Sequence, residues 1–306
     1  MTRVKAAVFL VLCTLFWAGN NVIGAEALDS IDPISLSWTR WLLAAVPLVV
    51  AAQLIERPDW HDALRSLPML GLLGLLGMTG FAALLYIALE FTSPLNASLI
   101  NGLGPMVTVA LAAILPAAWQ GGRRERITLR TAACLLLGLA GAIIVLTDGD
   151  VGALLRTGVN PGDLVMLLVI SSFAFYTLLG RRVTHIPAIT SVSIQTAAAV
   201  VLTAPLLLIN GLHWPTDPPG WGELGYIVLF PSIGSYVLWN AAVKRVPAST
   251  AAIYLNLMVV FPALLGLPFG YGITWAQVIG GVLVITAVIL LTRARSATPV
   301  SREPDA

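Results

Sequence analysis

The stretch TLRTAACLLLGLAGAIIVLT, residues 128–147, decides the fold. It holds a single charged residue, Arg130, close to its start. A helix of about 20 residues crosses a hydrocarbon core of about 30 Å. The loop before it, 117–127, carries three arginines, whereas the loop after it, 148–162, carries one. Because Lys and Arg collect in cytoplasmic loops, this stretch is predicted to cross a membrane from inside to outside.

Nine further apolar stretches of similar length lie on either side of this one. The ten predicted spans are 6–27, 34–55, 68–89, 95–116, 128–147, 163–182, 190–211, 222–243, 248–269 and 273–292. Helices are expected, because backbone polar groups in lipid must be satisfied within their own segment. Of the 17 basic residues, 15 fall on one side, and the exceptions are Arg156 in an outer loop and Arg40 within a span. The sequence therefore predicts an all-α integral membrane protein with ten transmembrane helices and both termini in the cytoplasm.

The composition limits the class of protein. Hydrophobic residues make up 58% of the 306 residues and charged residues 10%, with a mean hydropathy of +0.90. Soluble domains carry about 25% charged residues, so no soluble domain is expected. The basic residues are explained by topology, so the expected partners are a small-molecule substrate and the lipid bilayer, with no nucleic acid. Cys13 and Cys134 lie inside spans and are interpreted as packing residues, and no metal or cofactor is expected.

The chain repeats itself. The segment ALEFTSPLNAS, 88–98, aligns with AVKRVPASTAA, 242–252, and Trp17 aligns with Phe173. The predicted organisation is a first repeat at 6–147, a connecting loop at 148–162 and a second repeat at 163–293. Each repeat has five spans, an odd number, so the second copy must be inverted relative to the first. Inverted repeats place a substrate site near the middle of the membrane and support alternating access.

Four segments carry a resemblance to a known family: LFWAGNNV at 15–22, LSWTRWLLAA around Arg40, GLGPMVTVALAAIL at 102–115, and Glu125-Arg126-Ile127-Thr128. Over about residues 6–293 the chain resembles the EamA-type branch of the drug/metabolite transporter superfamily. The second copy departs from the pattern, because FGYGIT at 269–274 has Tyr271 in place of Glu125. The resemblance implies ten helices and transport of small metabolites, often export of amino acids or related compounds.

Polar and aromatic side chains inside the spans define a candidate substrate pathway: Asn20, Asn21, Arg40, Tyr86, Asn96, Asn101, Tyr176, Ser235, Tyr236, Trp239, Tyr254 and Asn256. Neighbouring residues on a helix are 100° apart, so Asn20 and Asn21 cannot both face one cavity. Their alternative role is to join helices through hydrogen bonds. The fourth and ninth spans, with Pro105 and Pro262, are predicted to form symmetric walls, and the alternative is a packing kink.

Arg40 is the basic residue that lies well inside a span. Such a charge is costly unless it faces a cavity or a partner. It is a candidate contact for a substrate carboxylate or phosphate, and with Glu26 and Glu90 it is a candidate outer gate. The alternative is a purely structural salt bridge to one of these glutamates, or snorkelling toward water.

Other residues are expected to have structural roles. Trp38, Trp41 and Trp221 are interpreted as anchors at the membrane interface. Four glycines spaced three residues apart in the third span are expected to allow close helix packing: Gly71, Gly74, Gly77 and Gly80. The loop that holds Glu56, Asp59, His61 and Asp62 is interpreted as a solvated loop rather than a metal site.

The predicted function is secondary transport of small metabolites by alternating access, with export of amino acids or related compounds favoured. A nucleotide-sugar or sugar-phosphate exchanger is the alternative, although such anions favour several buried basic residues. An integral membrane enzyme is disfavoured, because no catalytic motif is present. No Asp, Glu or His lies at the middle of a span, which favours facilitated movement or exchange over proton antiport. A bacterial inner membrane is the expected location, and substrate identity, coupling ion and oligomeric state are left open.

Overall fold

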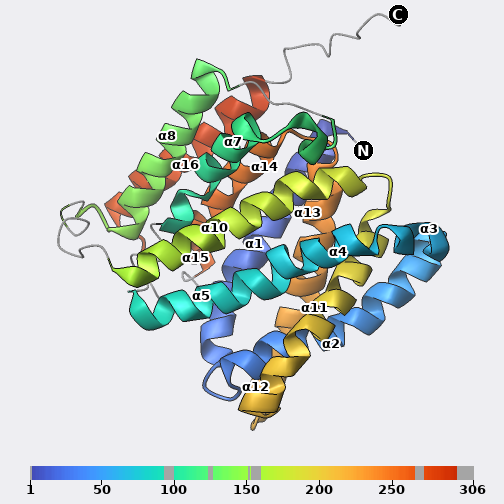
Figure 1. Cartoon of the computed structure of the whole chain (residues 1–306). Coiled ribbons are helices and arrows are strands. Elements are labelled where there is room, and N and C mark those ends of the chain that lie inside the picture. The colour runs from blue at the N-terminus through green and yellow to red at the C-terminus, as the bar shows by residue number, and fades with distance from the viewer. Residues whose placement is uncertain are drawn as a thin grey trace, which may run out of the picture.

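The computed structural model describes residues 2–92, 100–122, 127–150, 152, 160–265 and 272–294. Those residues form a bundle of helices, with no β strand among them (Figure 1). The helices of the first half are α1 (Arg3–Ala27), α2 (Pro33–Ala51), α3 (Trp60–Arg65), α4 (Leu67–Gly74), α5 (Gly80–Phe91), α7 (Gly104–Ile114) and α8 (Leu129–Leu146). Those of the second half are α10 (Pro161–Leu179), α11 (Ala188–Asn210), α12 (Pro218–Ile227), α13 (Ser235–Val243), α14 (Ala248–Ile253), α15 (Leu257–Leu265) and α16 (Trp275–Ala294).

Short turns of other helix types extend or interrupt these elements. π-Helical turns occur at η1 (Ala52–Glu56), η2 (Leu75–Thr79) and η5 (Val228–Gly234). 3₁₀ turns occur at η3 (Ala117–Gln120), η4 (Gly180–Val183) and η6 (Tyr254–Asn256). The spans predicted at 68–89, 222–243 and 248–269 are therefore not uninterrupted α-helices.

Six helical segments in the described part of the chain are long and apolar enough to cross a membrane: Pro33–Glu56, Leu129–Leu146, Pro161–Val183, Ala188–Ile209, Pro218–Val243 and Trp275–Thr292. Shorter apolar helices occur at Val4–Asn20, Leu67–Met78, Gly104–Ile114 and Ala248–Pro262. Each of these segments falls on one of the predicted spans. The prediction of an all-helical membrane protein is confirmed.

Side-chain caps fix where several helices begin. The Asp32 carboxylate accepts from the backbone N–H groups of Ile34 and Ser35 at the start of α2. Asn160 and Asp163 form a reciprocal capping box that starts α10. Caps of this kind satisfy N–H groups that have no partner within the helix. They define helix ends that hydrophobicity alone leaves open.

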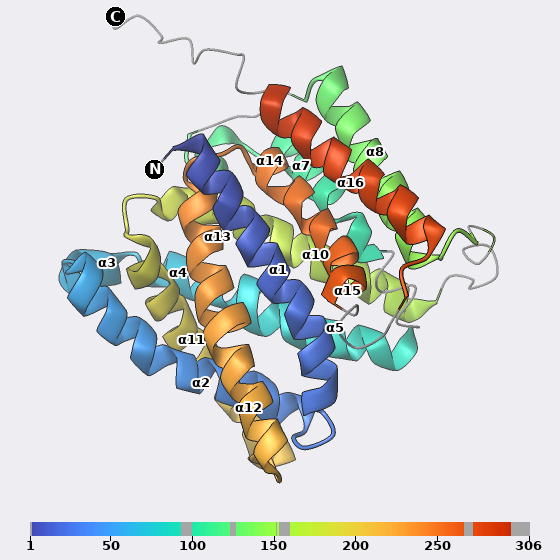
Figure 2. The ribbon, with the colours of Figure 1, turned by 180° about the vertical axis from the view of Figure 1, so that it is seen from behind.

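The packing of the helices is the same when the two halves are exchanged. α8 packs along α16, and α2 packs along α11. α1 packs against α13 and α15, just as α10 packs against α5 and α7. Figure 1 shows α10 and α5 on the near face, and Figure 2, from behind, shows α1 beside α12 and α13. A contact between two helices is thus matched by a contact between their counterparts in the other half.

Glycines allow the closest of these contacts. A Cβ atom on Gly141 of α8 would lie 2.6 Å from the Gly280 carbonyl oxygen of α16, and one on Gly280 would lie 2.5 Å from the Gly141 oxygen. In the third span, a Cβ on Gly74 would lie 2.6 Å from Gln195 O, and one on Gly77 would overlap the Tyr176 ring. The predicted packing role is therefore confirmed at Gly74 and Gly77. It is wrong at Gly71, which faces open space.

Candidate functional site

A cavity of about 570 Å³ lies where the two halves of the bundle meet. Its volume is in the range of about 300–1,000 Å³ that is typical of small-molecule sites. The polar side chains that line it are Asn20, Ser37, Arg40, Asn101, Thr108, Asn256 and Gln277. The aromatic ones are Trp17, Trp41, Phe81, Phe173 and Tyr236. The remaining wall is aliphatic and includes Leu85, Val145, Leu146, Ile170 and Met258. Among the described lining residues, Arg40 carries the one formal charge.

The cavity lies toward one end of the bundle. Ser37 is near the start of α2, and Gln277 is near the start of α16. Leu146 is the last residue of α8, and Asn20 is near the end of α1. Odd-numbered spans end on the side where even-numbered spans begin. The lining therefore comes from the end of the bundle that the loop charges predict to face outward.

Ser232 and Trp41 contact the Arg40 side chain at the cavity wall. Its Nε donates a hydrogen bond to Ser232 Oγ at 2.9 Å. Its guanidinium carbon lies 5.1 Å from the centre of the Trp41 ring, within the range of a cation–π contact. Ser232 comes from η5 and Arg40 from α2, so this cationic group is positioned by both halves of the chain.

Two amides in the lining have polar atoms whose hydrogen-bonding capacity is unused. Among the described residues, no hydrogen-bond partner reaches Asn20 Oδ1 or Asn256 Nδ2, although both atoms are buried. Buried polar groups without partners are rare in folded proteins and are commonly satisfied by a ligand or an ordered water. Asn256 packs closely on α8, because a Cβ on Gly138 would lie 2.7 Å from its Nδ2. Together with Arg40, these two residues form part of the polar wall of the cavity.

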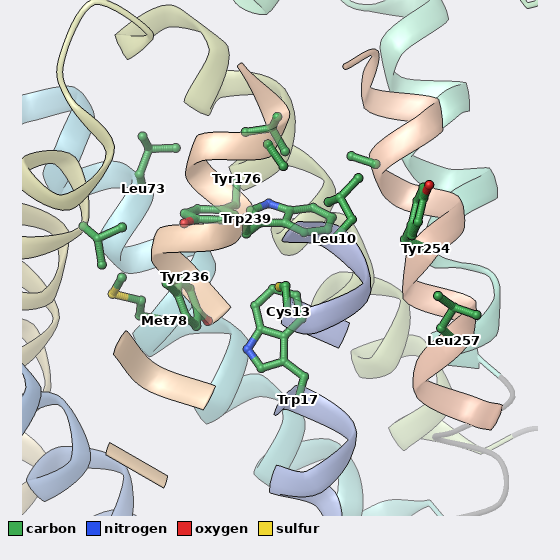
Figure 3. Packing of buried hydrophobic residues seen from close by; sticks show 14 of the residues in the cluster. Leu10, Cys13, Trp17, Leu73, Met78, Tyr176, Tyr236, Trp239, Tyr254 and Leu257 are labelled. Atoms are coloured by element: carbon green, nitrogen blue, oxygen red, sulfur yellow. The ribbon is translucent and has the colours of Figure 1, made fainter. Parts of the chain in front are cut away.

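An aromatic cluster adjoins the cavity, and three of its members also line it. It consists of Trp17, Phe173, Tyr176, Tyr236 and Trp239, four of which are labelled in Figure 3. The Trp17 ring centre lies 5.6 Å from that of Phe173, 5.5 Å from that of Tyr236 and 5.5 Å from that of Trp239. Edge-to-face and tilted pairs at these distances are favourable. The cluster joins α1, α10 and α13 beside the cavity.

Two polar tips of this cluster, on Tyr236 and Trp17, make contacts between the halves. Tyr236 OH donates to the Gly77 carbonyl at 2.5 Å, and Trp17 Nε1 donates to the Pro231 carbonyl at 3.2 Å. Gly77 lies in η2 and Pro231 in η5. π-Turns widen a helix locally and are frequent at functional sites. The two π-turns occupy matching places in the third helical segment of each half, and each supplies a carbonyl to an aromatic donor.

The structure brings together five of the predicted pathway residues at the cavity: Asn20, Arg40, Asn101, Tyr236 and Asn256. Four others do not line it. Tyr176 OH accepts from Asn240 at 2.6 Å, and Ser235 Oγ donates to the Cys13 carbonyl at 3.1 Å. Tyr254 OH pairs with Thr292 at 3.2 Å, and Trp239 is 0% exposed in the core. In this structure these four residues pack the core beside the cavity, and their pathway role stays a prediction.

The remaining predicted residues are placed less fully. Asn96 lies outside the described residues, and the side chains of Asn21, Tyr86 and Glu90 also lie outside the description. Glu26 is exposed near the end of α1 and does not line the cavity. The outer gate of Glu26, Arg40 and Glu90 therefore stays a prediction.

Two residues that line the cavity were not assigned this place from the sequence. Trp41 was predicted as an interface anchor, but it is 3% exposed and lines the cavity. Gln277 was missed, although TWAQ at 274–277 has the spacing of a capping box. Thr274 N donates to Gln277 Oε1 at 3.2 Å, and Gln277 N donates to Thr274 Oγ1 at 3.2 Å. In the fourth span, helical residues 100–102 are followed by a turn at Leu103, and Pro105 lies in the first turn of α7, where it is well tolerated.

The opposite end of the bundle is tied together by charged side chains. The Glu56 carboxylate accepts from the backbone N–H groups of Ile189 and Thr190, at 3.0 and 2.8 Å, and so caps α11. Glu56 is thus not a freely solvated loop residue. Arg181 donates to Val246 O at 2.7 Å, and Lys244 Nζ donates to Ile186 O. Burial lowers the pKa of Lys244 to about 8, with Arg245 acting in the same direction and Glu56 opposing it.

A multi-pass helical bundle with a polar, aromatic-walled cavity between two matching halves defines a membrane transporter. The chain belongs to the EamA-like transporter family of the drug/metabolite transporter superfamily, and the family pattern matches it twice, at residues 4–147 and 160–293. The resemblance inferred from the sequence is therefore confirmed.

Relatives along most of the chain are also transporters by name. YyaM, an uncharacterized transporter of Bacillus subtilis, is 29% identical over 83% of this chain and 82% of its own length. A probable terminal-alkyne amino-acid exporter of Streptantibioticus cattleyicolor is 28% identical over 94% of both chains. A crystal structure with a TM-score of 0.78 and 19% identity covers 97% of this chain and 100% of its own, and it shares the fold.

Proposed function

We propose that the protein is a secondary exporter of amino acids or closely related small zwitterions, and that the cavity is its substrate site. The observation that carries this proposal is the Arg40 guanidinium at the cavity wall. The other described side chains of the lining are uncharged polar, aromatic or aliphatic. A guanidinium is suited to bind a carboxylate. The neutral amides and aromatic faces suit an ammonium group and an apolar side chain.

The charge balance of the cavity favours this substrate class over a sugar phosphate. A phosphate ester with two negative charges needs more than one cationic contact to offset its loss of hydration. In the described lining, Arg40 supplies the one positive charge. The relative named a probable amino-acid exporter, which aligns along 94% of this chain, is in keeping with this choice.

We further propose ten membrane crossings in two inverted five-helix repeats. The protein lies in the inner membrane, and both of its termini face the cytoplasm. The exchange symmetry of the helix packing, the matched π-turns and the loop charges support this arrangement. With that topology the cavity faces outward, and the aromatic cluster and the ties at Glu56, Arg181 and Lys244 close the inner side. Transport then requires the halves to rock about the cluster and open the inner side.

The chemistry of the lining favours transport without a proton-carrying carboxylate. No Asp, Glu or His is found among the described residues that line the cavity. Facilitated export or exchange is therefore proposed in place of proton antiport.

Whole-cell efflux across a panel of the twenty standard amino acids tests the function. Cells with the wild-type protein should accumulate less of at least one amino acid than cells with Arg40→Gln at equal membrane abundance. Arg130→Gln is the matched control. This exposed arginine donates to Leu290 O and lies at the start of α8, whereas the cavity is lined by Val145 and Leu146 at the end of that helix. Identical accumulation of every amino acid in wild-type and Arg40→Gln cells would contradict the proposed function.

Cysteine labelling tests the topology. Thr216 is exposed in the segment between α11 and α12. Thr216→Cys should react with a membrane-impermeant maleimide added outside the cell. Reaction only with reagent supplied from the cytoplasm would contradict the proposed orientation.

A further inference from the structure

We propose that Ser232 is a positioning residue that orients the Arg40 guanidinium for the substrate carboxylate. This inference rests on the proposed function, since it concerns the same cavity. Ser232 is 0% exposed and is not itself part of the cavity lining, so it acts through Arg40.

The local helix geometry explains why the Ser232 hydroxyl is fixed. In an α-helix the N–H of residue 231 would donate to the carbonyl of Ile227. Pro231 has no N–H, so this α-helical bond cannot form, and the chain takes the π-turn η5, whose five-residue spacing brings Ser232 to Ile227 O. Ser232 Oγ donates to that carbonyl at 2.8 Å. The single hydroxyl proton is therefore committed to the helix backbone.

With the proton committed, only the lone pairs of Ser232 Oγ face Arg40. The Nε of Arg40 donates to this oxygen at 2.9 Å, and the Trp41 ring lies against the guanidinium. The hydrogen bond sets the direction of Nε, and the ring contact restricts the space open to the guanidinium. The edge of the guanidinium that carries Nε is thus held by the protein.

The contact crosses from one half of the chain to the other. Arg40 belongs to α2 and Ser232 to η5, which pack against each other. Substrate affinity then depends on this packing, because a movement of η5 relative to α2 removes the acceptor from Nε. The π-turn of the second half is in this way linked to the cation of the first half.

Transport in proteoliposomes tests the inference. The probe is whichever of the twenty standard amino acids the wild-type protein moves fastest, together with the amine that lacks its carboxylate. Ser232→Ala should raise KM for the amino acid about 10-fold, as expected for the loss of a hydrogen bond to a charged group. The maximal rate should change little, and the amine should be unaffected. Ser232→Thr, which keeps the hydroxyl, should restore most of the affinity.

A matched serine and a double substitution separate positioning from folding. Ser172 Oγ donates to Leu76 O at 2.7 Å beside the other π-turn, and it does not touch Arg40, so Ser172→Ala should leave KM unchanged. In an Arg40→Lys background, which has no guanidinium Nε, Ser232→Ala should have no further effect on KM. If Arg40→Gln impairs transport but Ser232→Ala leaves KM at the wild-type value, the positioning role is overturned and the proposed function stands. If Arg40→Gln itself has no effect, or if no amino acid is moved, the proposed function fails and this inference fails with it.

Discussion

Trp17 of α1 and Phe173 of α10 meet edge to face, with ring centres 5.6 Å apart and an interplanar angle of 81°. These two residues align with each other when the two halves of the sequence are superposed. Equivalent residues of two repeats can touch only near an axis that relates the repeats. In the proposed inverted-repeat arrangement this axis passes through the aromatic cluster, beside the cavity.

The fully buried Trp239 tests whether this cluster is structural. Trp239→Ala removes a large side chain that is 0% exposed, which should lower the free energy of unfolding by about 3–5 kcal/mol. Thermal unfolding in detergent measures the loss. Trp221→Ala is the control, because Trp221 is 49% exposed and should have little effect. A fully stable Trp239→Ala protein that no longer transports would instead support the pathway role predicted from the sequence.

The contact between α8 and α16 has no room for a methyl group. Gly141→Ala should destabilise the protein by about 1–3 kcal/mol, because the new Cβ would lie 2.6 Å from Gly280 O. Gly71→Ala, in open space on α4, should be neutral or stabilising by up to about 1 kcal/mol. Melting temperatures of the two variants decide the matter. Equal melting temperatures for Gly141→Ala and Gly71→Ala would contradict the close contact between α8 and α16.

The burial of Lys244 predicts a pH dependence of stability. Its pKa is lowered from 10.5 to about 8, so between these values the unfolded chain binds more protons than the folded chain. Stability contributed by this residue therefore rises with pH, by about 2 kcal/mol between pH 7 and pH 10. Melting curves of the wild type should show this rise relative to Lys244→Met. The other lysine of the chain, Lys5, is exposed, so Lys5→Met should keep the wild-type profile. A Lys244→Met profile parallel to the wild type would contradict the assignment.

The helices could be predicted from sequence because the length of each apolar stretch and the charge of the loops both indicate where the chain crosses a membrane. α8 begins at Leu129 and ends at Leu146, within one residue of the predicted limits. The interruptions could not be predicted equally well. Pro231 signals a disturbed helix in the second half, but the matching π-turn at Gly77 contains no proline and has no comparable signal.

The candidate site was predicted in part, because residue type does not say which way a side chain faces. Arg40 was placed in the pathway because a charge inside a membrane span is energetically costly, and Asn101 and Asn256 because they are polar. All three line the cavity. Trp41 was predicted as an interface anchor and Trp239 as a pathway residue from the same general preferences of tryptophan in membrane helices. Both are buried, but Trp41 faces the cavity and Trp239 faces the core. The difference depends on helix rotation, which tertiary packing decides.

Substrate protection of a cavity cysteine tests the central claim, that the cavity between the halves binds the transported amino acid. Asn101 lines the cavity and is exposed within it, so Asn101→Cys is introduced after the buried Cys13 and Cys134 are replaced by alanine. A membrane-impermeant maleimide added outside should label this cysteine, and the amino acid exported fastest should slow the labelling. Ala251→Cys, at a fully buried position in α14, should stay unlabelled. Labelling of Asn101→Cys at one rate with and without every transported amino acid would contradict the account.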